Sequence, residues 1–163
     1  MVRRPDYRGH ALRRNCCTNG CHDPLNQRDD AGSSGGRNMK IALTSISVND
    51  PIAAFKFYTE TLGFLEKLFL PEQSLAIVVS PEDKEGTTLL LEPRGGFGSD
   101  KFYDGIYEAG LPVIIFGVDD VQAEYEQLSS KGVVFRQAPT KTEWGTQAIF
   151  DDTCGNFIQI HQA

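Results

Sequence analysis

The chain has 163 residues, of which 40% are hydrophobic and 23% charged, and its formal net charge is −6. This length suffices for one domain, or for two small halves with a shared core, and the composition excludes wholesale disorder. No apolar run approaches the ~20 residues of a membrane-spanning helix, so a transmembrane protein is excluded.

Charge is unevenly distributed along the chain. Residues 1–38 hold seven Arg against four Asp, whereas residues 39–163 hold nine Lys or Arg against 18 Asp or Glu. The first segment has almost no apolar periodicity, so we predict that it is disordered. Whether it belongs to the native protein or is an artefact of the start site or of cloning stays open, because Met39 directly precedes the first predicted strand. The acidic remainder would repel phosphate, so nucleic acid is not an expected partner.

Cysteine is concentrated in the same segment. Cys16, Cys17 and Cys21 lie there beside His22, but their spacing does not match ordinary zinc folds, which favours adventitious metal binding or oxidation over a zinc site. Only Cys154 remains in residues 39–163, and we expect it to be an inert turn residue. A disulfide framework is therefore excluded for this part, and a reducing, cytoplasmic location is expected.

The first predicted strand covers residues 41–48, whose side chains alternate between two faces. Asp50 and Pro51 follow as the N-cap and first residue of a helix, and Gly63 is predicted to end it. Three further strand-like runs lie near residues 65–70, 75–80 and 87–92.

The second half of the chain repeats this pattern. Val48-Asn49-Asp50 recurs 70 residues on as Val118-Asp119-Asp120. A strand near 112–118 and a helix near 120–131 precede strands near 133–137, 146–150 and 156–161. Each half, about 40–93 and about 111–162, is therefore a βαβββ module. Together they predict an α+β fold with a curved, eight-stranded mixed sheet, helices on the convex face and a cavity on the concave one. Residues 94–98 are expected to form a flexible linker or lid.

Three motifs carry a resemblance to a known superfamily. They are Asp50-x-x-x-Ala54-x-x-Phe57-Tyr58-x-x-x-Leu62-Gly63-Phe64, Phe116-x-Val118-x-Asp120 and Phe150-x-Asp152-Thr153-x-Gly155-Asn156. In this order they resemble the glyoxalase / bleomycin-resistance / extradiol-dioxygenase superfamily, also called vicinal oxygen chelate proteins. Thr153 stands where that family usually has Pro. The resemblance covers residues 39–163 and implies the fold, while the function varies within the fold.

The resemblance also implies four metal-ligand positions, one on the first and one on the last strand of each module. They correspond to Leu43, Glu92, Val113 and Gln159. One carboxylate and one amide make a poor donor set for a divalent ion, so no metal cofactor is expected. A metalloenzyme built on Glu92, His161 and a further group is an alternative.

The expected function is binding of a small organic molecule in the concave cavity by a homodimer, since members of this family are commonly dimers. Ligand-binding candidates are Ser45, Ser47, Gln159, Phe157, Trp144 and Tyr103. The alternative is a lyase or isomerase without the family metal, with Glu92 and His161 as catalytic residues. Glu92 has two interpretations: a general base whose pKa is raised by an apolar trough, or a solvated carboxylate paired with Arg94 or a Lys. His161 is alternatively a plain residue of the sheet rim.

Overall fold

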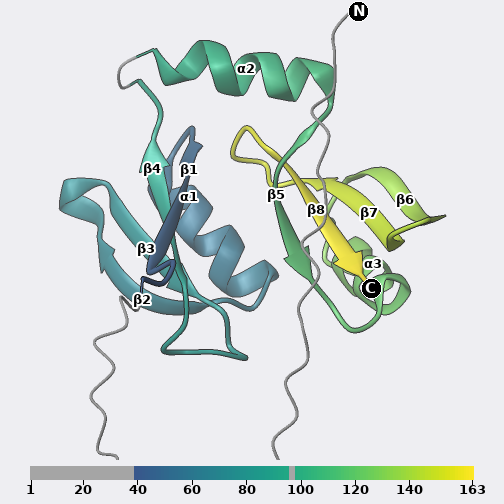
Figure 1. Ribbon diagram of the computed structural model, residues 1–163. Helices are drawn as coiled ribbons and strands as arrows, with labels where there is room; N and C mark the ends of the chain where they lie inside the picture. Colours follow the sequence, from purple (N-terminus) through teal and green to yellow (C-terminus); the bar gives the residue numbers. More distant parts are fainter. Residues whose placement is uncertain (1–38, 96–97) are drawn as a thin grey trace, which may run out of the picture. The chain divides into compact units, whose positions relative to one another are not determined.

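The computed structural model describes residues 39–95 and 98–163, which are drawn in colour in Figure 1. The predictions for residues 1–38, including those for Cys16, Cys17 and Cys21, lie outside the described residues. From Asn38 onward the chain forms one structural unit, to which both modules belong.

The first module follows the predicted order closely. Its elements are β1 (Leu43–Val48), α1 (Pro51–Lys56), the π-helical turn η1 (Phe57–Thr61), β2 (Leu65–Leu70), the 3-10 turn η2 (Pro71–Gln73), β3 (Leu75–Val79) and β4 (Thr88–Pro93). The carboxylate of Asp50 accepts hydrogen bonds from the backbone N–H groups of Ile52 (2.8 Å) and Ala53 (3.3 Å), which fixes the start of α1. Gly63 follows the helix with φ +82°, a conformation that favours glycine. The N-cap and stop predicted from the sequence are thus confirmed.

The second module repeats these devices. It consists of β5 (Pro112–Gly117), α3 (Val121–Ser130), β6 (Phe135–Thr142), β7 (Gly145–Asp151) and β8 (Phe157–Gln162). The Asp120 carboxylate accepts from the N–H groups of Gln122 (2.9 Å) and Ala123 (3.0 Å), as Asp50 does in the first module. The internal repeat is therefore structural, although β6 extends beyond the predicted end at residue 137.

The eight strands are confirmed, but within the described residues they form two four-stranded sheets. The strand orders are β1-β4-β3-β2 and β5-β8-β7-β6. In each sheet the first and last strands of the module pair in parallel, and the other pairs are antiparallel. The expected single curved sheet is not confirmed, because β1 and β5 are edges of separate sheets. Side chains rather than a backbone ladder join the modules: Phe57, Leu62 and Phe116 pack against the buried cores of both.

A helix that the sequence did not indicate connects the modules. This helix, α2 (Ser99–Ala109), links β4 to β5 (Figure 1). The linker or lid expected for residues 94–98 precedes this helix and stays a prediction, since residues 96–97 lie outside the described residues. The helix lacks a side-chain N-cap, since Gly98 precedes it, and the neighbouring glycines favour a loop over a helix. In the described part of the chain, no helix is both long and apolar enough to cross a lipid bilayer.

Candidate functional site

Each sheet has one face packed on the core and one that is not, which we call its open face. In the first sheet, Ser45 lies opposite Leu90, which in turn lies opposite Ile77. The adjacent strand residues Ile46 and Leu91 point the other way and are buried in the core. The alternation predicted for β1 therefore holds and places Ser45 on the open face.

Both open faces expose large apolar side chains. On β1 the side chain of Leu43 is 45% exposed, and on β5 that of Ile115 is 57% exposed. Leu68, opposite Ile77, is also exposed. Apolar side chains gathered on one face are typical of a surface that another molecule covers.

Ser47 and Glu92 lie directly opposite each other at the end of the β1–β4 pair. Ser47 is buried, while Glu92 is exposed. Arg94, one predicted partner of Glu92, instead binds the Asp104 carboxylate at 2.7 Å and the Gly155 carbonyl at 2.6 Å. In residues 39–95 and 98–163 no ion pair includes Glu92, so its carboxylate is available to solvent or to a ligand.

A second polar group lies on the open face of the second sheet. Gln159 donates through Nε2 to the side-chain oxygen of Gln147 at 3.2 Å. In the β7–β8 ladder His161 lies opposite Gln147. The Nε2 of His161 donates to the Trp144 carbonyl at 2.8 Å. The Trp144 side chain is 82% exposed. Three predicted residues, Gln159, His161 and Trp144, are thus brought to one region.

The structure gives Phe157 and Tyr103 packing contacts instead. Phe157 is only 7% exposed, because the ring of Tyr107 on α2 stacks on it at 4.4 Å and the Arg136 guanidinium lies over it at 5.1 Å. Tyr103 packs against Phe102, and its ring lies 5.6 Å from the Arg94 guanidinium. The stacking of Tyr107 on Phe157 depends on α2, and the Arg136 contact comes from β6, which explains why the pattern of the last strand alone suggested an exposed Phe157.

The four family metal positions are not neighbours in register. Leu43 pairs with Thr88, whereas Glu92 pairs with Ser47, four residues or about 13 Å further along the strands. Gln159 pairs with Ile115 rather than with Val113. In the described ranges no three His, Cys, Asp or Glu side chains are grouped so as to hold a metal ion. The residues at these positions do not fit a family metal centre, and the absence of a cofactor stays a prediction.

Cys154 lies in the turn before β8 and is buried. Burial raises the pKa of its thiol to about 11, and the nearby Asp152 carboxylate adds to the shift. A thiol with so high a pKa is a poor nucleophile at neutral pH, in agreement with the expectation of an inert residue.

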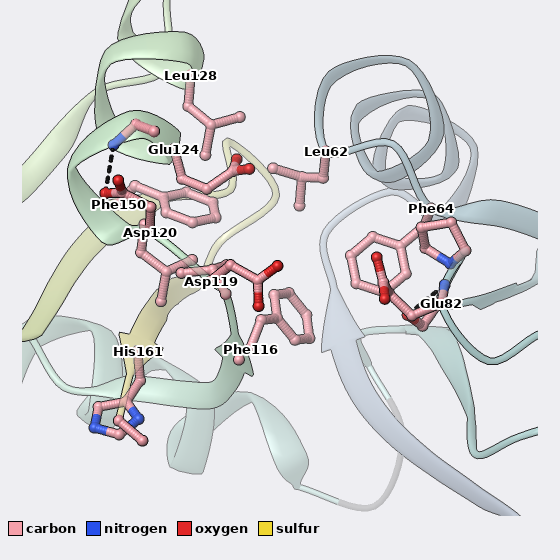
Figure 2. Close-up of a pocket in the computed structure, with 17 residues that line it drawn as sticks. Leu62, Phe64, Glu82, Phe116, Asp119, Asp120, Glu124, Leu128, Phe150 and His161 are labelled. Carbon is pink, nitrogen blue, oxygen red and sulfur yellow. Dashed lines mark hydrogen bonds between the residues drawn. The ribbon is translucent and has the colours of Figure 1, made fainter. Parts of the chain in front are cut away.

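A cavity of about 650 Å³ lies between the modules. Figure 2 shows Leu62, Phe64 and Glu82 of the first module facing Phe116 and Asp119 of the second. Of the predicted site residues only His161 lines it. Sequence reasoning missed this cavity because it forms where the modules meet. One signal was available: Asp119 and Asp120 are carboxylates at the boundary between a strand and a helix.

Comparison with known proteins identifies the family. Residues 40–160 match the Glyoxalase/Bleomycin resistance protein/Dioxygenase superfamily, and the chain belongs to this family. The resemblance inferred from the three motifs is confirmed.

Individual relatives cover the same part of the chain. The uncharacterized protein YurT of Bacillus subtilis (strain 168) is 48% identical over 126 residues, which are 76% of this chain and 99% of YurT. The crystal structure of UcmS2 is similar, with 29% identity and a TM-score of 0.64, and the match covers 76% of this chain and 97% of UcmS2. The crystal structure of TnmS3, an antibiotic-binding protein from Streptomyces sp. CB03234, is also similar, with 29% identity and a TM-score of 0.61. This match covers 76% of this chain and 95% of TnmS3.

Proposed function

We propose that this protein binds a small organic molecule on its open faces, as a homodimer and without the family metal. One observation carries the proposal: exposed apolar side chains such as Ile115 lie directly beside the hydrogen-bonding groups of Gln159, Gln147 and His161. Ligand sites commonly combine an apolar surface with a few convergent polar groups. TnmS3, a protein of similar fold with 29% identity, binds an antibiotic, and this supports a small organic molecule as the ligand here.

The homodimer follows from the exposure of the open faces. Leu43 and Ile115 sit on rigid strands and leave about half of their surface in contact with water. A second copy that covers these faces would remove apolar area from water and enclose the polar groups. A cytoplasmic location is part of the proposal, since residues 39–163 contain a single cysteine.

Binding without the family metal rests on the residue types. Leu43 and Val113 have no donor atoms, and Gln159 is neutral, so Glu92 is the one anionic group among the four positions. A single carboxylate cannot offset the desolvation of a divalent ion.

Thermal-shift screening of the full chain against small organic molecules, aromatic antibiotics included, tests the proposal. Hits are titrated by the fluorescence of Trp144, the only tryptophan of the chain. We expect Gln159→Leu to lower the affinity for such a compound by about tenfold or more. The control Gln127→Leu, at an exposed position of α3, should leave affinity unchanged. If no compound raises the melting temperature, or if both variants bind like the native protein, the proposal fails.

A metal-independent lyase or isomerase is the second candidate, and the exposure of Glu92 favours it. The carboxylate lies beside Ser47, outside any ion pair in the described residues. A bound substrate that covered it could use it as a general base. Turnover of a screening hit that Glu92→Gln abolishes without loss of affinity would establish this function. Unchanged hits after prolonged incubation would exclude it for those compounds.

A further inference from the structure

The cavity between the modules has the size of a ligand site. Its volume of about 650 Å³ falls within the range of roughly 300–1,000 Å³ that small-molecule pockets occupy. Both modules contribute to its wall: Leu62 and Phe64 follow α1, and Phe116 and Leu128 belong to β5 and α3. The cavity therefore exists only in the assembled pair of modules.

The floor of this cavity is apolar and aromatic. Phe150, Ile160 and Leu128 are buried at its base. The rings of Phe64 and Phe116 contact each other at 5.0 Å between centroids, tilted by 56°. Aromatic faces carry a negative quadrupole that attracts cations as well as apolar groups.

The rim of the cavity is acidic. Four side-chain carboxylates line it, those of Glu82, Asp119, Asp120 and Glu124, and no Lys or Arg side chain does. The Asp120 carboxylate is engaged in capping α3. In the two described ranges none of the four belongs to an ion pair. In Figure 2, Asp119 and Glu124 extend from the second module toward the side where Leu62 and Phe64 lie.

These carboxylates suit an organic cation better than a metal ion. No three of the described acidic, His or Cys side chains are grouped closely enough to hold a metal, so the charge is spread around the rim. A spread of negative charge above an apolar floor matches a molecule with an apolar body and an amine, amidine or quaternary nitrogen.

The geometry points to a second binding site, separate from the open faces, that takes an organic cation with an apolar aromatic body in the cavity between the modules. The body lies against Phe64 and Phe116, and the cationic group faces Asp119, Glu124 and Glu82. This site goes beyond the proposed function, because core-side residues such as Phe116, Phe150 and Ile160 form its walls, and His161 is the one open-face residue assigned above that also lines it.

Titration of the full chain with ethidium, a cationic aromatic dye, and with anilinonaphthalene sulfonate, an anionic one, tests this site. Ala123 lines the cavity and Gln122, its neighbour in α3, does not. Arginine is a good helix former at either position. Ala123→Arg should therefore fill the cavity with a cationic side chain, while the control Gln122→Arg adds the same charge outside it. We expect Ala123→Arg to weaken ethidium binding by about tenfold or more, and Gln122→Arg to leave it nearly unchanged.

A charge-matched pair of triple variants tests the acidic rim independently, so the test survives if Ala123→Arg folds poorly. The rim variant carries Glu82→Gln, Asp119→Asn and Glu124→Gln. The control carries Glu66→Gln, Glu72→Gln and Glu108→Gln, all exposed and outside the cavity.

Loss of ethidium affinity in the rim triple variant but not in its control supports the site, as does weaker binding at higher salt. Equal losses in both triple variants would show attraction by the acidic surface as a whole and overturn the proposal. Preference for the anionic dye, no ethidium binding, or loss of ethidium binding in Gln159→Leu would also overturn it. The last outcome places the dye on the open face.

Discussion

The hydroxyl of Tyr58, in the helical segment of the first module, donates a hydrogen bond to the carboxylate of Asp152 in the second, with 3.2 Å between the oxygens. Both side chains are fully buried. The same carboxylate accepts the backbone N–H groups of Cys154 and Asn156 and the Asn156 side-chain amide, at 2.8 to 3.0 Å. Asn156 in turn donates to the Ser47 carbonyl at 3.1 Å. The Asp-x-x-Gly-Asn motif therefore links the two modules through a buried polar network.

Removing the Tyr58 hydroxyl should destabilise the protein. We expect Tyr58→Phe to lower the free energy of unfolding by about 2 kcal/mol, since it removes a hydrogen bond to a buried carboxylate. Urea unfolding followed by circular dichroism measures the change. The control is Tyr125→Phe on α3, whose hydroxyl has no hydrogen bond in the described residues and whose ring stays packed on Phe135. An equal loss of stability in both variants would show that the buried hydroxyl has no special role.

The raised pKa of the Asp152 carboxyl predicts that the free energy of unfolding depends on pH. Burial raises its pKa above the ordinary value of 3.8, and its hydrogen bonds oppose this only in part. Between pH 3.8, the ordinary pKa that applies to the unfolded state, and the higher pKa of the native state, Asp152 binds its proton more tightly in the native state. Stability from this group is therefore present below pH 3.8 and is lost as the pH rises through the native pKa.

Comparison with Asp152→Asn isolates this contribution, because asparagine does not titrate. The free energy of unfolding of the native protein minus that of the variant should fall as the pH rises from about 4, and then level off. Urea titrations at successive pH values measure this difference. A difference that increases with pH would mean that the hydrogen bonds outweigh burial.

The sequence predicted this network's residues as motif positions but not their contacts. Local signals were sufficient for the elements within the two modules: Asp50 and Asp120 cap helices, and Gly63 ends the first. Alternation along the strands also predicted on which face side chains lie, as for Ser45 and Gln159 on the open faces.

Features that depend on contacts between modules could not be predicted from local patterns. Helix α2 lacks a capping side chain, and its contact with Phe157 is a tertiary one. The strands form two separate sheets, and the modules are joined by side chains such as Phe57 and Leu62, which pack against both cores. The cavity lined by Phe64 and Phe116 arises from the same packing.

The homodimer should depend on the open faces. We expect Ile115→Lys to convert the dimer to a monomer at micromolar concentration, because a charge would be buried in an apolar contact. Light scattering measures the mass. Ile52→Lys, an exposed apolar position on α1, should remain dimeric. Moderate salt should not dissociate the native dimer. If the native protein is monomeric at this concentration, the proposed homodimer is wrong.

Purified protein should carry far less than one equivalent of zinc, nickel, iron or manganese. The full chain with Cys16→Ser, Cys17→Ser and Cys21→Ser removes the competing thiols of the first segment. Chelator treatment of this variant should leave its melting temperature unchanged, since no native-state metal is lost. Metal analysis checks the content directly. Stoichiometric metal, with a lower melting temperature after chelation, would show that Glu92 and His161 have partners that residue types did not indicate.

The most direct test of ligand binding on the open faces is a crystal structure of the full chain with a compound that raises its melting temperature. We expect a dimer in which the compound lies on an open face, in contact with Gln159 or its neighbours Gln147 and His161, with no metal beside Glu92. A compound bound through a metal ion, or bound elsewhere while the open faces remain solvent-exposed in a monomer, would overturn the proposed function.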